Sequence, residues 1–344
     1  MLTVLIPTHN RPGYLRRCLD YLVHTAPGAR VVVADSSEGV AFEQNVELVR
    51  NPSSTIRIDH IDCRGKDITE KYVYALSSID TLFVVVCGDD DFLVYENALR
   101  CADFLRTHQD YSHAHGRIIT FWEQPSVKSP VQRIQEYRQI RNDGDPGDRI
   151  EKHFLEYHNN FYSVHRTAPL LANIIEVNSL CVGRGLKERA LAALDICQGK
   201  RMMLDCLFML RQKGMTGLDE NGNRTFLDNP SDDNYFQKIG FGYSEYLRLI
   251  DRHLSDAYGI EEEDKARIID AIGKDYEKWK KIRSAPIKCR RGILNRLRRG
   301  LGKTRLRLHH YKTLYSIVRS DINHYKQAIE SMRRFYALRG NADV

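Results

Sequence analysis

Short apolar runs alternate with amphipathic segments along the first 120 residues of the chain. Continuous apolar runs bounded by turn residues are typical of buried strands, and apolar residues at intervals of three and four indicate helices. An Asp-x-x-Glu start signal precedes one of the helices. The predicted strands are residues 2–6, 31–34, 55–61 and 82–87, and the predicted helices are residues 12–24, 68–79 and 95–107.

This order of elements predicts an α/β domain in which helices flank a mixed, mainly parallel sheet. In such sheets, ligands bind beyond the carboxyl ends of the strands. Thr8, Asp35 and the triplet Asp89-Asp90-Asp91 each follow a predicted strand directly. We therefore expect these polar side chains to meet at one edge of the sheet.

The second half of the chain has a less regular pattern. Its polar stretch over residues 122–147 predicts a loop or lid, and residues 184–214 are expected to be largely helical. The pattern predicts a domain over residues 1–230 and a helical, basic C-terminal region over residues 231–344. The other expected elements are strands at 117–121 and 161–164, helices at 148–158 and 166–175, a turn-rich stretch at 216–242, and helices from 243 onward.

The composition is that of an ordinary globular protein, with 42% hydrophobic and 28% charged residues among 344. The apolar run from Leu82 to Cys87 is far shorter than the ~20 residues that a membrane-spanning helix needs. The N-terminus shows neither a basic leader nor a cleavage site, so we expect no signal peptide. None of the eight cysteines forms a Cys-x-x-Cys pair, which indicates free thiols and a cytoplasmic location.

The net charge of +7 is unevenly distributed along the chain. Between Glu277 and Asp321 there are 15 basic residues and no acidic residue, whereas the first 277 residues are net negative. An acidic body does not fit a nucleic-acid-binding enzyme. An apolar stripe from Ile287 to Leu308 lies among these basic residues, so residues 284–315 are expected to contact an anionic membrane peripherally, on its cytoplasmic face. The alternative is a helix that packs on the body of the protein.

The acidic triplet carries the strongest chemical signal. Three adjacent carboxylates at the end of a buried strand repel one another, and a divalent cation would neutralise them. Mg²⁺ and Mn²⁺ prefer oxygen ligands and often combine one or two carboxylates with substrate phosphates. The alternative is an exposed acidic turn. Asp35, Thr8 and Asn10 likewise have a simpler interpretation as turn or cap residues.

Three segments resemble motifs of the family 2 GT-A glycosyltransferases. Residues 4–19 are similar to the opening of that family, residues 32–37 to its second-strand aspartate motif, and residues 87–92 to its Asp-x-Asp region. The resemblance covers residues 2–120 and extends more thinly to 215. Gly88 departs from the pattern, because many members have Asp at the first position of Asp-x-Asp-Asp. The resemblance implies a GT-A (Rossmann-like) fold.

The same resemblance implies the roles of several residues. Residues 204–211 are similar to a family helix that carries the catalytic base, and Asp205 falls on that base, although Leu204 replaces the usual Glu. Asp195 and Glu188 are the alternatives, and Asp205 has a simpler interpretation as a helix-surface residue. The metal ligands would come from Asp89, Asp90 and Asp91, with Asp90 and Asp91 favoured. The implied residues of the nucleotide-sugar site are Pro7, Thr8, Asn10, Arg11, Asp35, Ser36, Asp67, Lys71, Asp89 and Asp90.

An aromatic and basic segment over residues 161–166 is expected to contact the acceptor through Tyr162, His165 and Arg166. Its alternative is a set of core aromatics with a surface His-Arg pair. His113 and His115 are interpreted as structural residues.

Together these features predict a metal-dependent (Mn²⁺ or Mg²⁺), inverting glycosyltransferase. It would move a sugar from a nucleoside-diphosphate sugar to a hydroxyl of a glycan or lipid-linked acceptor, as in polysaccharide biosynthesis. Two alternatives remain open, a nucleotidyltransferase of similar layout and a non-catalytic nucleotide-sugar-binding protein. The first would normally carry a Gly-rich loop after the first strand, and this chain has none there.

Overall fold

The computed structural model describes most of the chain. The turn-rich prediction for residues 216–234 and the apolar stripe from Ile287 to Leu308 lie outside the described residues. The described residues are 1–50, 55–123, 131–137, 145–155, 157, 159–182, 184–213, 235–256, 260–284 and 321–340.

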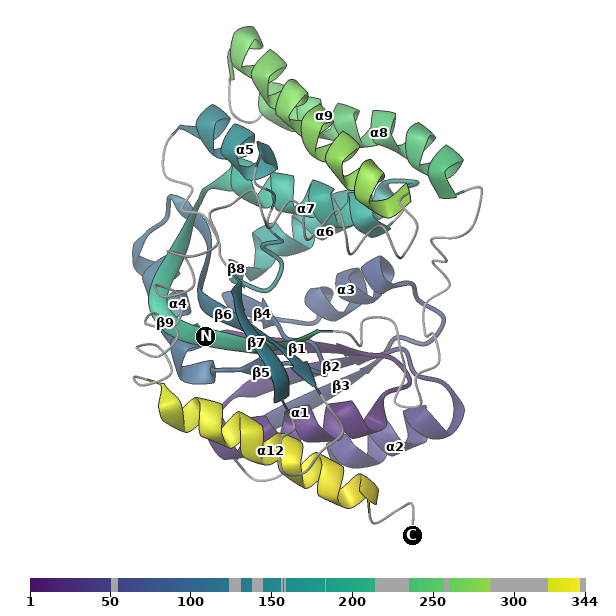
Figure 1. The fold of residues 1–344 in the computed structure, drawn as a ribbon, viewed down its shortest axis with the longest axis vertical. Coiled ribbons are helices and arrows are strands. Elements are labelled where there is room, and N and C mark those ends of the chain that lie inside the picture. Colours follow the sequence, from purple (N-terminus) through teal and green to yellow (C-terminus); the bar gives the residue numbers. More distant parts are fainter. Residues whose placement is uncertain are drawn as a thin grey trace.

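Nine strands form one mixed sheet in the described part of the chain, with helices on both of its faces (Figure 1). The strands are β1 (Leu2–Thr8), β2 (Arg30–Asp35), β3 (Arg57–Asp62), β4 (Phe83–Val86), β5 (Phe92–Leu93), β6 (Tyr111–Glu123), β7 (Val131–Tyr137), β8 (Val164–Arg166) and β9 (Lys200–Lys213). The helices are α1 (Pro12–Thr25), α2 (Gly39–Arg50), α3 (Ile68–Ser77), α4 (Tyr95–Thr107), α5 (Pro146–Leu155), α6 (Thr167–Ser179), α7 (Arg184–Gln198), α8 (Tyr235–Asp256), α9 (Glu262–Ser284) and α12 (Ile322–Gly340).

The strand order is β3-β2-β1-β4-β8-β6-β9-β5, and β7 pairs with β6. The N-terminal part, β3-β2-β1-β4, is wholly parallel, and antiparallel pairs enter with β8, β7 and β5. The four strands and three helices expected over the first 107 residues are all present. The sequence pattern missed α2, although the parallel pair β2 and β3 needs a crossover connection of this kind.

The register of β1 places the polar strand ends together. Thr8 lies opposite Asp35 in the parallel pair with β2, and Leu5 lies opposite Val86 in the parallel pair with β4. The chain therefore leaves β4 beside the end of β1, where the Thr8 hydroxyl donates a hydrogen bond to Asp89. This confirms the expectation that Thr8, Asp35 and the acidic triplet lie together at one edge of the sheet.

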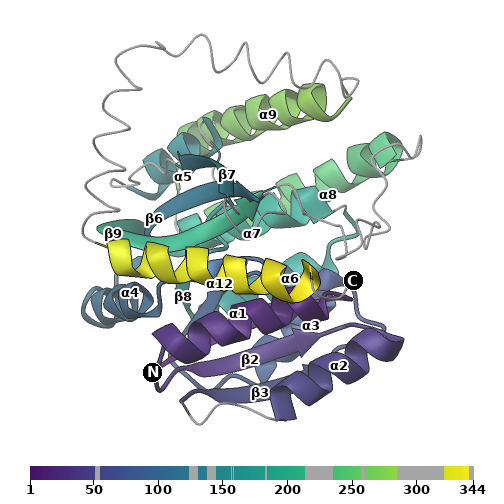
Figure 2. The same cartoon turned by 60° about the horizontal axis from the view of Figure 1, so that its bottom comes forward.

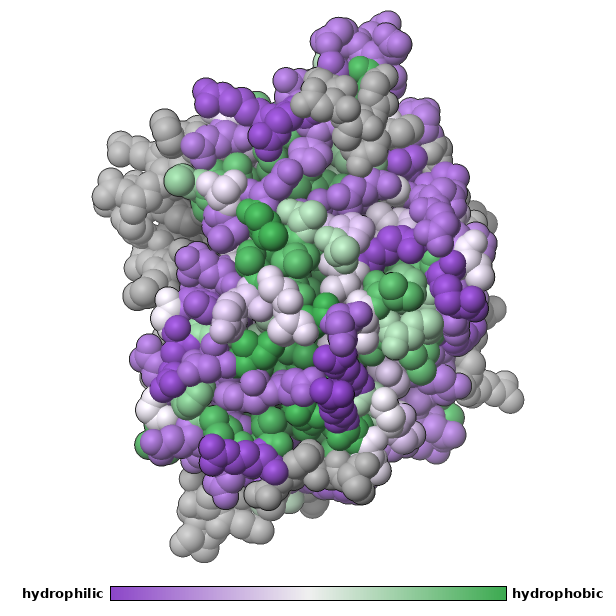
Figure 3. Space-filling view, turned by 180° about the vertical axis from the view of Figure 1, so that it is seen from behind, coloured by the Kyte–Doolittle hydropathy of each residue, from purple (hydrophilic) through white to green (hydrophobic). Residues whose placement is uncertain are grey.

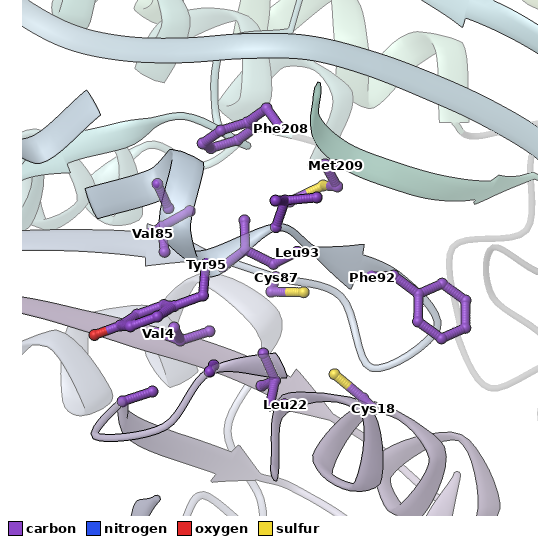
Figure 4. Close-up of a cluster of buried hydrophobic side chains, with 14 of the residues drawn as sticks. Val4, Cys18, Leu22, Val85, Cys87, Phe92, Leu93, Tyr95, Phe208 and Met209 are labelled. Carbon is purple, nitrogen blue, oxygen red and sulfur yellow. The ribbon is translucent and has the colours of Figure 1, made fainter. Parts of the chain in front are cut away.

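Two hydrophobic clusters cover the two faces of the sheet. Alternate residues of β1 face opposite sides, so Val4 packs in the cluster with α1 and α4, and Leu5 packs in the cluster with α3, α6 and α7. The close-up in Figure 4 shows Val4, Leu22 and Val85 in the first cluster, with Phe208 and Met209 above them. These packed layers fix the strand ends that carry the polar residues.

Three predictions for the second half of the chain are wrong. Residues 235–242, which were expected to be turn-rich, form the start of α8. Residues 200–213 form β9 instead of the second half of a helix, because this segment adds a strand between β6 and β5. Residues 131–137 form β7 within the stretch that was expected to be a loop. The two helices expected at 148–158 and 166–175 are present, with shifted bounds, as α5 and α6, and the strand expected at 161–164 is present as β8.

The helices beyond residue 231 pack on two different faces of the domain. α8 and α9 lie against α7 and α5, whereas α12 runs beside α1, as both ribbon views show, and lies opposite α8 and α9 in Figure 1 (Figures 1 and 2). Within the described residues, no helix is both long and apolar enough to cross a membrane. In the view from behind, apolar surface patches lie between hydrophilic side chains (Figure 3).

Gly116 is expected to be essential for the close pairing of β6 and β9. A Cβ atom at Gly116 would meet the Cys206 carbonyl oxygen at 2.6 Å and the Cys206 Sγ at 2.9 Å. Gly116→Ala should therefore lower the free energy of unfolding by about 1–3 kcal/mol in urea denaturation. Gly273 in α9 is the matched control, because its nearest neighbour would lie 3.8 Å away and alanine favours helix. Equal effects of the two substitutions would contradict this account.

Candidate functional site

A cavity of about 250 Å³ opens where β1 and β4 end. Its walls come from the segment after β1, the start of α3, the acidic triplet, α6, α7 and the end of β9. Its lining combines carboxylates and cations with the apolar side chains of Ile174, Val177 and Leu191. Eight of the predicted site residues line this cavity: Pro7, Thr8, Arg11, Lys71, Asp89, Asp90, Asp91 and Tyr162.

Arg11 neutralises part of the triplet. Its guanidinium lies 2.9 Å from Asp89 Oδ1 and donates a hydrogen bond of 2.8 Å to Asp90 Oδ2. The Thr8 hydroxyl donates to the other oxygen of Asp89 at 2.8 Å. Burial alone would lower the pKa of Arg11, but the carboxylates of Asp89 and Asp90 raise it above its ordinary value. Arg11 is therefore a permanent cation, and both oxygens of Asp89 are engaged.

Asp91 is held from the other side of the cavity by the end of β9. The backbone N–H of Gln212 donates to Asp91 Oδ1 at 2.8 Å, and Arg211 Nε lies 3.9 Å from Asp91 Oδ2. The Arg211 guanidinium also stacks on the ring of Tyr162, 3.8 Å from its centroid. β9 thus brings a cation to the triplet that periodicity did not reveal, because the segment was expected to be helical.

Burial and like charge disfavour the ionised forms of Asp89 and Asp91. Burial raises the pKa of Asp91 to about 8; the charge of Asp90 adds to the shift, while Arg211 and the Gln212 N–H oppose it. Burial also raises the pKa of Asp89 to about 6, against the opposing charge of Arg11. Additional positive charge at this place would favour the ionised carboxylates.

Gly88 leaves the space into which two carboxylate oxygens point. A Cβ atom on Gly88 would lie 2.9 Å from Asp90 Oδ1 and 3.0 Å from Asp91 Oδ2. These are not the oxygens through which Asp90 binds Arg11 and Asp91 binds the Gln212 N–H. The departure from the family pattern at Gly88 therefore has a physical reason, because a side chain would push into this space.

This donor set fits a hard divalent cation. Mg²⁺ and Mn²⁺ sites commonly use one or two carboxylates plus phosphate oxygens. Asp90 Oδ1 and Asp91 Oδ2 converge on one small space and could ligate one ion. The described residues contain no group of three or more His, Cys, Asp or Glu side chains arranged to hold a metal by themselves. Phosphate oxygens would have to complete the coordination.

Lys71 brings a further cation to the cavity from α3. Its ammonium group is buried and donates to the Thr8 carbonyl oxygen at 2.8 Å. Asp67 begins this helix, because its carboxylate accepts hydrogen bonds from the Thr69 and Glu70 N–H groups. Asp67 does not line the cavity, so the structure assigns it a capping role.

Asp35 is fully buried beside the cavity and does not line it. Its carboxylate accepts hydrogen bonds from the Ser37 N–H and Asn45 Nδ2, and it pairs with His60 Nε2 at 3.1 Å. Burial would raise the pKa of Asp35, but these three partners hold it below its ordinary value. Direct contact between Asp35 and a nucleoside would require a partner to move.

Asn10 and Ser36 organise the same loop region. Asn10 adopts a left-handed backbone with φ 54°, its N–H donates to the Ser37 hydroxyl, and its side-chain oxygen accepts from the Glu38 N–H. The Ser36 N–H donates to the Thr8 carbonyl oxygen at 3.2 Å. Neither residue lines the cavity. They act as turn residues here.

Asp205 lies away from the cavity. It sits on β9 and not on a helix, its side chain is 81% exposed, and it pairs with Arg117 at 2.6 Å. The strand pairing with β6 sets this position. The helix that was expected to present Asp205 as a base is therefore absent.

Glu188 is the carboxylate that α7 places in the cavity. It is half-buried, and it accepts a hydrogen bond from the Tyr157 hydroxyl at 3.2 Å. Lys187 beside it also lines the cavity and donates to the Asn178 carbonyl oxygen at 3.3 Å. The sequence indicated Glu188 only as an alternative, because no periodicity shows which face of α7 meets the cavity.

Of the three predicted acceptor residues, only Tyr162 lines the cavity. His165 is buried, and burial lowers its pKa to about 4. Arg166 donates to the carbonyl oxygens of Leu105 and His108, so it joins α4 to β8. His165 and Arg166 have structural positions in this fold.

Asp195, the other alternative base, is buried behind the cavity wall. It accepts from Asn173 at 2.9 Å and lies 3.6 Å from His165, and burial raises its pKa to about 7. His113 stacks on His165 with ring centroids 5.2 Å apart. Asp195, His165 and His113 do not line the cavity. They form a buried polar layer between α7 and the sheet.

No protein-family model and no curated protein matches the chain. Among solved structures, it resembles that of S. aureus TarS 1-349, with 15% sequence identity over 99% of this chain and 91% of that chain, at a TM-score of 0.50. A longer S. aureus TarS structure matches with 16% identity over 80% of this chain, at a TM-score of 0.48. That match covers 43% of the longer chain, so this chain spans less than half its length.

A further similar structure is S. aureus TarS 1-349 in complex with UDP-GlcNAc, with 14% identity over 99% of this chain and 92% of that chain, at a TM-score of 0.45. At such identities the likeness concerns the fold alone. The mixed sheet with helices on both faces and a helical C-terminal part is a GT-A-type fold. This confirms the fold class that the sequence motifs implied.

The buried triplet should make stability depend on pH. The folded-state pKa of Asp91 lies near 8, above its ordinary value of 3.8, so its contribution is present at low pH and is lost as pH rises through about 8. In EDTA, the free energy of unfolding should fall between pH 6 and pH 9, and Asp91→Asn should reduce that fall. Urea titrations at pH 6 and pH 9 measure this free energy of unfolding for both chains. Asp103→Asn, at an exposed site, is the control, and an Asp91→Asn variant with an unchanged pH profile would contradict the account.

Proposed function

We propose that the chain is a metal-dependent glycosyltransferase that uses a nucleoside-diphosphate sugar as donor. The observation that carries the proposal is one cavity lined by the acidic triplet, by the cations Arg11, Lys71 and Arg211, and by Glu188. A diphosphate needs cations and a divalent metal, and sugar transfer to a hydroxyl needs a base. The GT-A-type fold supports the same interpretation.

The donor diphosphate would bind among Arg11, Lys71 and Arg211. Arg211 has a planar guanidinium that suits bidentate phosphate binding, and its stacking on Tyr162 orients that plane. Lys71 is fixed by its bond to the Thr8 carbonyl oxygen, close to the end of β1. The nucleoside would then extend toward the loop that Asp35 and Asn10 organise.

Asp90 and Asp91 would hold the Mg²⁺ or Mn²⁺ through the two oxygens that converge over Gly88. When bound, the ion would stabilise the negative charge of the departing nucleoside diphosphate. Asp89 would support the site without ligating the metal, because Thr8 and Arg11 engage both of its oxygens. Asp89 remains essential in this scheme, since it fixes Arg11.

Glu188 would act as the base in place of Asp205. As the acceptor oxygen forms a bond to the anomeric carbon, the bond from that carbon to the diphosphate oxygen breaks, and the acceptor proton passes to the Glu188 carboxylate. A single displacement of this kind inverts the anomeric carbon, as the sequence resemblance implies. The Tyr157 hydroxyl would orient the carboxylate through the bond to Glu188 Oε1.

The acceptor would be a glycan or a lipid-linked sugar that enters along the wall of α6 and α7. Tyr162 and Phe161 offer aromatic faces in the cavity, and Ile174 and Leu191 offer aliphatic surface. Such a wall suits the apolar faces of a sugar ring.

Donor binding should depend on a divalent cation. In thermal-shift measurements with UDP, GDP, ADP and CDP, at least one nucleotide should stabilise the chain in the presence of Mn²⁺ and lose most of its effect in EDTA. A nucleotide at about 100 times its Kd would add about 2.7 kcal/mol of stability. The same titration with Asp91→Asn should show no Mn²⁺-dependent gain. The proposal fails if none of the four nucleotides stabilises the wild-type chain in a Mn²⁺-dependent way.

Glu188 and Asp205 can be separated by matched substitutions. Glu188→Gln should lower transfer by about 10²- to 10⁴-fold while leaving nucleotide binding intact, because it removes the base and keeps the shape. Asp205→Asn should leave transfer nearly unchanged, because this exposed residue lies outside the cavity and pairs with Arg117. Both rates can be measured as nucleoside-diphosphate release from the sugar nucleotide. The reverse ranking of the two variants would restore Asp205 as the base.

A further inference from the structure

The C-terminal helix α12 contacts Arg17, and Arg17 in turn binds the backbone of the acidic triplet. The helix lies along α1, where Ala328 and Met332 are fully buried, and the Ser331 hydroxyl donates to the Arg17 carbonyl oxygen at 3.4 Å. Just before the helix, the Asp321 carboxylate accepts a hydrogen bond from the Leu207 N–H on β9. α12 is thus attached both to α1 and to β9, the two elements that flank the triplet (Figure 2).

Arg17 joins those two sides of the cavity. Its buried guanidinium donates to the Asp90 carbonyl oxygen at 2.8 Å and to Gln212 Oε1 at 2.7 Å. The N–H of the same Gln212 holds Asp91 Oδ1. One side chain of α1 therefore fixes the backbone of Asp90 relative to the strand end that positions Asp91.

Three aromatic rings enclose the Arg17 guanidinium. Its central carbon lies 4.9 Å from the ring centroids of Tyr14 and Phe92, and 5.1 Å from that of Phe335. Phe335 is the contribution of α12, and it also packs on Tyr14 at 5.3 Å. An enclosed guanidinium makes stronger hydrogen bonds than a hydrated one, because the local dielectric is lower and the ring faces attract the cation.

We propose that Arg17 is a positioning residue for the metal–diphosphate site and that α12 keeps it in place through Phe335. The ligand in this statement rests on the proposed function, whereas the positioning itself concerns only the arrangement of Asp90, Asp91 and Gln212. The C-terminal part of the chain is then a component of the donor site, more than 200 residues away in sequence from the triplet.

Hydrogen–deuterium exchange of the ligand-free chain tests the positioning directly. Phe335→Ala should accelerate exchange at the Asp91 and Gln212 N–H groups by about tenfold, because the Arg17 guanidinium becomes hydrated and its bonds weaken. Phe335→Tyr, which keeps the ring, should restore the wild-type rates. If Phe335→Ala does not fold, Phe335→Leu removes the ring and keeps apolar volume.

Met332→Ala is the matched control on the same helix, since Met332 is buried against the core and no cation–π contact to Arg17 involves it. It should accelerate exchange within α12 and α1 and leave the Asp91 and Gln212 amides protected. Unchanged exchange at these two amides in the folded Phe335 variant overturns the proposal. Equal acceleration in Met332→Ala does so as well, because it would show that any loosening of α12 suffices.

A binding measurement tests whether the position of Arg17 affects metal and nucleotide binding. Arg17→Lys keeps the charge, but its ammonium nitrogen lies one bond closer to the backbone and it lacks the planar group that the three rings enclose. It should therefore raise at least tenfold the Mn²⁺ concentration needed for half-maximal stabilisation by the best of the four nucleotides. Turnover at saturating Mn²⁺ should change much less. If wild-type chain shows no Mn²⁺-dependent nucleotide binding, the proposed function fails, while the exchange result still decides the positioning role.

Discussion

Two of the three adjacent carboxylates at the end of β4, Asp89 and Asp91, are buried, and Asp90 between them is only partly exposed. Their mutual repulsion and loss of water raise the pKa values of Asp89 and Asp91, and every neighbouring element contributes something that opposes this cost. The segment after β1 supplies Arg11 and Thr8, and the end of β9 supplies Arg211 and the Gln212 N–H. A divalent cation bound between these carboxylates would favour their ionised forms.

The arrangement also explains why distant segments of the chain converge here. β1 and β4 lie side by side in the sheet, β9 lies between β6 and β5, and α12 packs on α1. Each brings one kind of group to the triplet: a cation, a backbone donor, or an aromatic cover for a buried cation. The opposite wall comes from α6 and α7, which bring apolar side chains and Glu188. In the proposed function, the triplet and its cations would hold the donor, and α6 and α7 would face the acceptor.

The sequence predicted the N-terminal half of the fold and the triplet well, because buried strands have continuous apolar runs and their ends are clear. It missed the nature of β9, since Leu204 and Phe208 are spaced as on a helix, and only pairing with β6 and β5 makes the segment a strand. Asp205 was consequently predicted on the wrong kind of element, and Glu188 was only an alternative. The sequence patterns at Asp35 and Asp67 fit a ligand-binding role and a structural role equally well. The structure separates the two, because Asp35 is buried with three hydrogen-bond partners and Asp67 caps α3 locally, as the Asp-x-x-Glu signal indicated.

The position of the metal tests this account most directly. Crystals grown with Mn²⁺ and a nucleoside diphosphate that stabilises the chain would show the ion by anomalous scattering. The account predicts one peak between Asp90 Oδ1, Asp91 Oδ2 and phosphate oxygens, above Gly88, with the phosphates near Lys71 and Arg211. A diphosphate bound outside this cavity, or a Mn²⁺ peak away from Asp90 and Asp91, would contradict it.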